Sequence, residues 1–157
     1  MDVNFPLQII GAGRYVPERV VTAAEVEQLC GIKPGWIARR AGVLERRWAT
    51  EETASFMGAA AAREAMAQAK LDWNDIDLIL NASGTVQQAI PDGAALLQRE
   101  LGLGMSGIPC MSVNATCLSF LVALDMAASL LATGRYRTIL IYSADVGSIG
   151  LNFQEPE

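Results

Sequence analysis

The sequence predicts an α/β fold in which helices cover both faces of a mostly parallel sheet. Short segments rich in β-branched residues alternate with longer helical segments along the chain, and this alternation is typical of parallel sheets. One helical segment, residues 118–133, is apolar nearly all round. Because such a helix has no side that suits water, we expect it to be buried between layers. The 157 residues have room for one domain with a substantial core.

The first predicted elements are a strand over residues 7–10 and a short helix over residues 22–30. The strand ends at Gly11 and Gly13, but Val16 stands where a dinucleotide-binding motif needs its third glycine. A tight turn is therefore the favoured interpretation of these glycines. Thr22 and Glu25 form a capping-box pattern, which marks the start of the helix.

The remaining elements alternate between helix and strand. Pro91 suits the first turn of a helix, and Pro109 suits the start of a strand at a sheet edge. Such an edge is free to pair with another chain. The predicted helices cover residues 51–70, 91–101 and 118–133, and the predicted strands cover residues 77–83, 108–113 and 138–143.

Composition restricts the classes of partner and site. The net charge of −5 argues against nucleic acid as a partner. The sequence shows neither an apolar run as long as a membrane span nor a signal-peptide pattern, so we expect no membrane partner. The three cysteines show no disulfide pattern, so we expect a reducing, cytoplasmic setting. Without histidine or a paired CxxC motif, neither a metal site nor a disulfide framework is expected. The hydrophobic content of 52% suggests a large interface or a missing second half.

Residues 33–48 combine two tryptophans with a cluster of four arginines: Arg39, Arg40, Arg46 and Arg47. Aromatic planes beside guanidinium groups suit a ligand that carries a flat ring and phosphates. The alternative is a solvated basic surface whose tryptophans pack inward. The residues alone favour this second interpretation.

Cys117 is the candidate nucleophile, because it lies where a predicted strand turns into the apolar helix. Thiolate, rather than thiol, is the nucleophilic form of cysteine. The unpaired N–H groups and the positive dipole end of a helix stabilise a negative charge nearby. The alternative is a small buried hydrophobic residue, as most free cysteines are. Position alone favours this alternative.

Four motifs taken together resemble those of a known family. Residues 9–18 are similar to the family's opening segment, residues 36–47 to its coenzyme A-binding segment, residues 89–91 to a loop that reaches the acyl pocket of the dimer mate, and residues 113–120 to its nucleophile motif. They occur in the family's order over essentially the whole chain. The sequence thus resembles the N-terminal half of a thiolase-fold condensing enzyme of the β-ketoacyl-acyl-carrier-protein synthase III type.

The resemblance implies a thiolase-like layered fold and a set of site residues. Cys117 would take an acyl group from acyl-coenzyme A, and its backbone N–H would form part of the oxyanion hole. Trp36 would stack on the adenine of coenzyme A and Arg40 would contact the nucleotide portion, which reverses the interpretation of the basic segment. Ile90 would line the acyl pocket of the neighbouring subunit, and Phe120 would belong to the substrate-binding site.

The reaction implied by the resemblance passes the acyl group to a carbanion derived from malonyl-acyl carrier protein, as in fatty acid or polyketide initiation. It implies a homodimer, with acyl-coenzyme A as substrate and no separate cofactor. Other uses of the same cysteine are non-decarboxylative condensation and acyl transfer to oxygen or nitrogen. A non-catalytic partner subunit and a simple coenzyme A-binding module are further alternatives.

Three departures from the family pattern qualify these expectations. Ser119 replaces a glycine that the family usually has, and Ile90 replaces a phenylalanine common in acetyl-specific members. The second change predicts a roomier pocket for longer or bulkier primers. The third departure is the last loop, residues 152–157, which holds only acids among its charges, whereas the family often supplies an arginine to the coenzyme A phosphates there. The chain contains no histidine, although the family uses a histidine and an asparagine from its second half. We therefore expect residues 1–157 to be one N-terminal half domain, truncated before its last strand and without the C-terminal half, that does not condense by itself.

Overall fold

A computed structural model describes residues 7–154 of the chain. The described residues form two compact units, each considered by itself below. The first unit comprises residues 7–15 and 53–145, and the second comprises residues 16–52 and 146–154. No helix among the described residues has the length and apolar character needed to cross a membrane.

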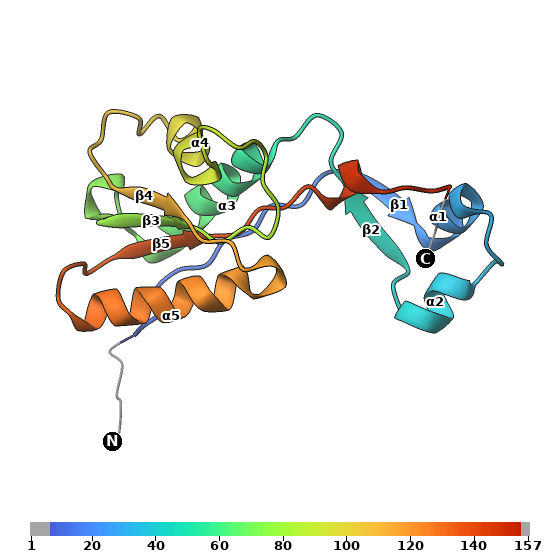
Figure 1. The fold of residues 1–157 in the computed structure, drawn as a ribbon, viewed down its shortest axis with the longest axis horizontal. Helices are drawn as coiled ribbons and strands as arrows, with labels where there is room; N and C mark the ends of the chain where they lie inside the picture. Colours follow the sequence, from blue (N-terminus) through green and yellow to red (C-terminus); the bar gives the residue numbers. More distant parts are fainter. Residues whose placement is uncertain (1–6, 155–157) are drawn as a thin grey trace, which may run out of the picture. The chain divides into compact units, whose positions relative to one another are not determined.

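The first unit is built around a three-stranded parallel sheet in the order β4-β3-β5 (Figure 1). Its central strand β3, Leu78–Asn81, pairs on one side with β4, Cys110–Ser112, and on the other with β5, Ile139–Tyr142. Every residue of β3 is buried. This burial explains why the strand reads as one continuous apolar run.

Helices cover both faces of this sheet, which confirms the predicted fold class (Figure 1). Ile79 packs with the helices α3, Ala54–Ala69, and α4, Gly93–Glu100. Its neighbours Leu78 and Leu80 pack on the other face, against α5, Ser119–Ala132. The period of two along a strand sends successive side chains to opposite faces. One short strand therefore contributes to the two hydrophobic clusters of this unit, one on each face of the sheet.

The starts of α3 and α4 are fixed by side-chain caps. Thr53 accepts a hydrogen bond from the Phe56 N–H at 3.1 Å, and Asp92 accepts one from the Ala95 N–H at 3.2 Å. The cap at Asp92 corrects the prediction that Pro91 opens the helix. Since an N-cap oxygen satisfies an otherwise unpaired N–H group, the helix begins after the aspartate. Pro91 instead belongs to the preceding loop, after a cis peptide bond.

The apolar helix α5 is covered on one side only, which differs from the expectation of burial all round. Ala123 and Ala127 are at most 1% exposed and face the sheet. Phe120, Leu121 and Val122 keep 45%, 59% and 38% of their surface exposed. The physical reason is that the first unit contains a single sheet, and one sheet covers only one stripe of a helix.

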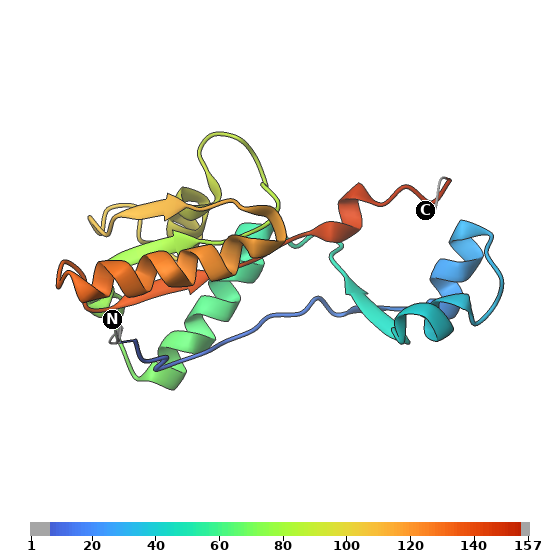
Figure 2. The same ribbon diagram turned by 60° about the horizontal axis from the view of Figure 1, so that its bottom comes forward.

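Residues 7–15 do not form the predicted strand. They form an extended segment that lies alongside α3 (Figure 2). The Ala12 N–H donates to Gln68 Oε1 at 2.5 Å and the Arg14 N–H to Glu64 Oε2 at 2.7 Å. A Cβ at Gly11 or Gly13 would collide with the backbone of this helix. The glycines therefore serve close approach to α3, and the tight-turn interpretation is wrong.

The second unit contains an antiparallel pair of strands that the sequence did not predict. Strand β1, Arg19–Thr22, pairs with β2, Glu45–Trp48, with Val21 opposite Arg46. Between them lie α1, Ala23–Cys30, and α2, Trp36–Ala41. The start of α1 is confirmed, because Thr22 Oγ1 accepts from the Glu25 N–H at 3.2 Å. Three short 3-10 turns, η1 to η3, complete the elements of the described chain, at Trp73–Asp75, Thr116–Leu118 and Gly147–Gly150.

Candidate functional site

Cys117 lies in the 3-10 turn η2, between β4 and the start of α5. Its side chain is exposed, whereas Cys30 and Cys110 are half-buried. The thiol is thus placed at the amino end of the apolar helix and is open to solvent. This exposure excludes the alternative of a buried hydrophobic cysteine.

The turn before the thiol is strained and held by hydrogen bonds. Thr116 has a φ of 52°, a left-handed conformation that is unusual for a β-branched residue. The Ser119 hydroxyl donates to the Thr116 carbonyl at 2.7 Å and accepts from the Ala115 N–H at 2.9 Å. Asn114 Oδ1 accepts from the Thr116 N–H at 3.1 Å. Strained backbone persists only where its surroundings fix it, and these bonds do so directly before Cys117.

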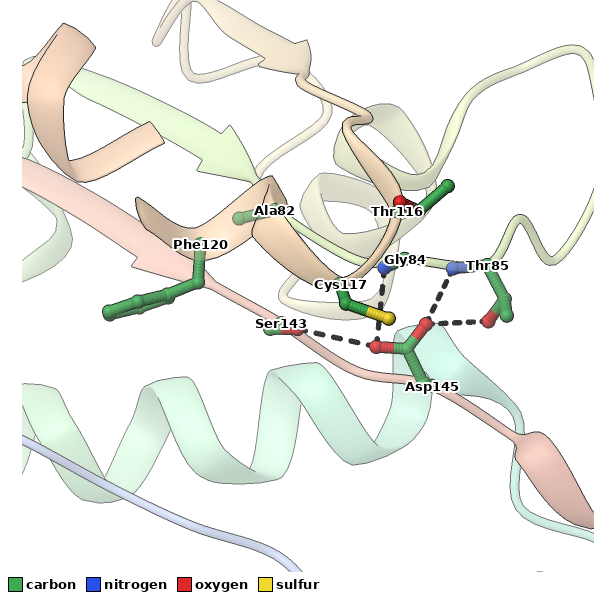
Figure 3. A pocket seen from close by; sticks show the side chains of 8 residues that line it. All are labelled: Ala82, Gly84, Thr85, Thr116, Cys117, Phe120, Ser143 and Asp145. Atoms are coloured by element: carbon green, nitrogen blue, oxygen red, sulfur yellow. Dashed lines mark hydrogen bonds between the residues drawn. The ribbon is translucent and has the colours of Figure 1, made fainter. Parts of the chain in front are cut away.

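The thiol opens onto a pocket of about 300 Å³ in the first unit (Figure 3). The lining comes from the segments that follow the carboxyl ends of all three parallel strands, where open α/β sheets usually bind ligands. The pocket next to Cys117 has room for a small acyl group. The lining residues are Ala82, Gly84, Thr85, Thr116, Cys117, Phe120, Ser143 and Asp145.

Asp145 ties together two of the segments that line the pocket (Figure 3). Its carboxylate accepts hydrogen bonds from the N–H and the hydroxyl of Thr85, both at 2.6 Å. It also accepts from the Gly84 N–H and the Ser143 hydroxyl, both at 3.3 Å. Gly84 also lies against the turn that carries Cys117 (the nucleophile turn, residues 116–118). A Cβ at Gly84 would come within 3.2 Å of the Thr116 carbonyl oxygen. Asp145 therefore holds the loop that supports this turn.

A buried polar network joins the strand ends beneath the pocket. The Ser83 hydroxyl donates to Asn81 Oδ1 at 2.6 Å and accepts from the Ala144 N–H at 3.0 Å. Asn81 Nδ2 donates to Ser112 Oγ at 3.0 Å. Because buried polar groups are costly unless they are paired, this network fixes the relative positions of β3, β4 and β5 at the pocket.

Sequence reasoning missed Asp145 and the Asn81–Ser83 pair. The signal that could have found them is the placement of polar residues directly after predicted parallel strands. The carboxyl ends of such strands meet at one edge of the sheet, so Ser83 and Asp145 were candidates for the same site.

The remaining candidates in the first unit are placed differently. Phe120 lines the pocket together with Cys117. Ile90 lies outside this pocket, and its side chain is 88% exposed. The loop around Ile90 is held locally, because Gln88 Nε2 donates to the Ile90 carbonyl at 3.0 Å.

Trp36 and Arg40 belong to the second unit, where both lie on α2. The Arg40 Cζ atom is 6.0 Å from the centre of the Trp36 ring, and Trp36 is 44% exposed. Trp48 behaves differently, because it packs within its unit. Its ring centre lies 5.6 Å from that of Phe153, and the Arg19 Cζ atom lies 5.3 Å from the Trp48 ring centre. One tryptophan thus remains available for a ligand, while the other packs within its unit.

Arg46 is the one half-buried member of the basic cluster, and Arg47, although exposed, is engaged in hydrogen bonds. Arg47 Nη1 donates to the carbonyls of Pro17 and Glu18, at 3.3 and 3.2 Å, and so serves the packing of β2. Arg39 and Arg40 are exposed on α2. The candidate ligand surface is therefore the Trp36–Arg40 pair.

Cys110 provides a contrast with Cys117. Burial, and secondly the charge of Asp92, raise the pKa of the Cys110 thiol. This thiol also donates to Gln98 Oε1 at 3.5 Å. A raised pKa keeps a thiol protonated and unreactive, so Cys110 is a packing residue. Among the described residues, no cluster of three or more His, Cys, Asp or Glu side chains suits a metal ion.

The comparisons with known proteins agree with this geometry. Residues 111–157 match a family model described as 3-oxoacyl-[acyl-carrier-protein] synthase III. The chain is 34% identical over 148 residues to the β-ketoacyl-[acyl-carrier-protein] synthase III of Aquifex aeolicus, covering 94% of this chain and 47% of the relative. The counterpart from Chlamydia trachomatis is 36% identical over 148 residues, covering 94% of this chain and 45% of the relative.

Solved structures of this type share the fold. The crystal structure of the Aquifex aeolicus enzyme superposes with a TM-score of 0.89 at 34% identity, covering 94% of this chain and 47% of that one. A priming β-ketosynthase of a polyketide pathway superposes with a TM-score of 0.86 at 29% identity, covering 94% and 44%. The chain spans about half the length of the relatives it matches. In sequence and in fold, it is thus related to the thiolase-fold condensing enzymes of the β-ketoacyl-acyl-carrier-protein synthase III type, and matches their N-terminal half.

Proposed function

We propose that this chain is the acyl-accepting half of an acyltransferase that condenses an acyl group with a malonyl-derived carbanion. The observation that carries the proposal is the exposed Cys117 thiol, at the amino end of α5 and on the pocket. A nucleophile in this position has solvent access and faces the space in which an acyl group would lie. The related proteins are named as synthases of this type.

In the first step, the Cys117 thiolate attacks the carbonyl carbon of an acyl-coenzyme A. The negative charge that develops on the carbonyl oxygen is stabilised by an oxyanion hole that includes the Cys117 backbone N–H. The new bond joins the sulfur of Cys117 to the acyl carbon. Coenzyme A leaves as a thiolate and takes up a proton. The product is an acyl-enzyme, the covalent intermediate typical of nucleophilic catalysis.

In the second step, malonyl-acyl carrier protein loses carbon dioxide and its carbanion attacks the acyl carbon. The bond to Cys117 breaks and the sulfur leaves as thiolate, which restores the enzyme. The groups that promote decarboxylation would come from the half of the related proteins that this chain does not match. No separate cofactor takes part, because coenzyme A enters as part of the substrate.

The surrounding assignments belong to the same proposal. Trp36 stacks on the adenine of coenzyme A, Arg40 contacts its nucleotide portion, and Phe120 lines the acyl site. Ile90, exposed on its loop, reaches the acyl pocket of the second subunit of a homodimer and leaves room for primers larger than acetyl. The protein acts in the cytoplasm, in fatty acid or polyketide initiation, and residues 1–157 form its N-terminal half domain.

Intact-protein mass spectrometry after incubation with acyl-coenzyme A tests the proposal. We expect an increase in mass equal to one acyl group, located on the Cys117 peptide and absent in Cys117→Ala. The matched control is Cys110→Ala, which removes a half-buried thiol and should still be acylated. An adduct that persists in Cys117→Ala, or coenzyme A binding without any adduct, would contradict the proposal.

A further inference from the structure

Glu27 in α1 carries a buried carboxylate that the proposed function leaves unused. The residue is 4% exposed. Its two oxygens accept hydrogen bonds from the backbone N–H groups of Gly35, at 2.7 Å, and Ile37, at 2.8 Å. Burying a charge is costly unless it is hydrogen-bonded. These two charge-assisted bonds are of the strong kind, so the carboxylate has a defined task in the fold.

The two donors stand directly before and after Trp36 in the chain. The Trp36 N–H itself donates to the Lys33 carbonyl at 3.1 Å. Gly35 is the N-cap of α2 and has no side chain to bind the free N–H groups of the first turn. Glu27 therefore does from α1 what a capping side chain does within most helices.

The position of α2 depends on this cap to an unusual degree. The helix has six residues, which is far below the length at which a helix is stable without tertiary support. None of its residues is buried and only Ile37 and Ala38 are half-buried, so packing supports its placement only in part. Gly35 has a φ of 77°, and a Cβ there would come within 2.9 Å of Arg39 Nη1. The chain before Trp36 thus follows a tight path that the Glu27 carboxylate fixes.

We infer that Glu27 is a positioning residue for nucleotide binding, which it serves by fixing the first turn of α2. Through that turn it holds the exposed Trp36 ring, with the Arg40 guanidinium 6.0 Å from the ring centre. The nucleotide of a coenzyme A thioester would lie on this pair. The inference rests on the proposed function in one respect, namely that Trp36 and Arg40 bind coenzyme A.

Glu27→Gln is the direct test, because an amide keeps the size of the side chain but turns an NH₂ group toward a backbone donor. Calorimetric titration with coenzyme A should show binding weakened about tenfold, the size of one charge-assisted hydrogen bond. The matched control is Glu25→Gln, on the same helix, whose partly exposed carboxylate contacts Arg19 at 3.5 Å. We expect the control to change binding by less than about twofold, as for an exposed ion pair.

A second readout separates positioning from a general loss of structure. An acyl thioester of N-acetylcysteamine carries no nucleotide, so its reaction does not depend on the Trp36–Arg40 pair. It should acylate Cys117 of Glu27→Gln at a rate within about twofold of the wild-type rate, the size of effect expected for a substitution outside the Cys117 pocket. Acylation by low concentrations of acyl-coenzyme A should fall in proportion to the weakened binding. If Glu27→Gln does not fold, Glu27→Asp keeps the charge but shortens its reach, and the same two measurements apply.

The inference would be overturned if Glu27→Gln bound coenzyme A as tightly as the wild-type protein does. It would also be overturned if the rate of acylation fell equally with both thioesters. The absence of coenzyme A binding in the wild-type protein would overturn it too. Failure of the proposed function looks different. In that case coenzyme A binding depends on Glu27, but neither thioester leaves an acyl group on Cys117.

Discussion

Ser119 shows how one side chain shapes the nucleophile turn. The residue is 1% exposed, and its hydroxyl bonds both the Ala115 N–H and the Thr116 carbonyl. The resemblance to the synthase III family implies a glycine at this position, and a glycine offers no such bonds. Here the left-handed Thr116 needs support that a hydroxyl supplies. The departure at Ser119 is therefore matched by a local hydrogen-bond pattern next to Cys117.

Replacing Ser119 by alanine should lower the free energy of unfolding by about 1–3 kcal/mol, because it leaves the half-buried Ala115 N–H without its acceptor and removes one of the two bonds to the Thr116 carbonyl. Urea denaturation measures this difference. Ser129→Ala removes an exposed hydroxyl from the same helix and should change the free energy by no more than about 0.5 kcal/mol. Equal effects of the two substitutions would show that the Ser119 hydroxyl does not support the turn.

At the scale of elements, single carboxylates join segments that are far apart in the chain. Asp145 joins the segment after β5 to the loop after β3. Asp77 makes a similar link at the other end of the sheet, where its Oδ2 atom accepts from the N–H groups of Arg137 and Thr138 at 2.7 and 3.0 Å. The Asp77 N–H also donates to the Thr138 carbonyl at 2.9 Å. These links set the register of β5 against β3.

The Asp77 link predicts a dependence of stability on pH. Hydrogen bonds from the backbone of Arg137, and then of Thr138, lower the pKa of Asp77 below its ordinary value of 3.8. Protonation is then harder in the folded chain than in the unfolded chain, so the stabilisation is complete above the ordinary pKa and is lost as the pH falls through the folded one. The stability difference between wild type and Asp77→Asn should be constant near neutrality and shrink below about pH 4.

Urea denaturation at a series of pH values measures this difference. Asp125→Asn, which changes an exposed carboxyl group on α5, serves as the control. A difference between wild type and Asp77→Asn that stays the same down to the lowest pH would contradict the assigned role of the carboxylate.

At the scale of the whole molecule, stability and function are distributed unevenly. The first unit contains both hydrophobic clusters and the pocket, and β3 contributes to both clusters. The second unit carries the Trp36–Arg40 pair. The sheet covers one side of α5, and the other side leaves apolar side chains exposed on the surface of the first unit. The central strand is therefore the element on which folding of the first unit depends most.

Leu80→Ala should lower the free energy of unfolding by about 2–5 kcal/mol, because Leu80 is fully buried and its truncation leaves a cavity against α5. Leu121→Ala makes the same chemical change where the side chain is 59% exposed. We expect about 0.5 kcal/mol or less for this control. Chemical denaturation of both variants provides the test, and similar losses would contradict the central role of β3.

The sequence by itself determined the parallel α/β architecture, the position of Cys117 between strand and helix, and the cap at Thr22. These features depend on periodicity and on neighbours a few residues apart, which a single sequence displays directly. The missed strands β1 and β2 have a different cause. Residues 45–48 are charged and aromatic and carry no apolar alternation, so their pairing depends on the partner strand.

Only the tertiary structure decided which side of α5 stays open and which polar groups hold the site. Asp145 reaches Thr85 across 60 positions in the chain, and Glu27 caps a helix to which it does not belong. Neither contact has a local pattern, because a hydrogen bond at a distance in sequence is created by the fold that brings its partners together. The nucleophile was therefore visible in the sequence, whereas the groups that hold it and its ligand surface in place were not.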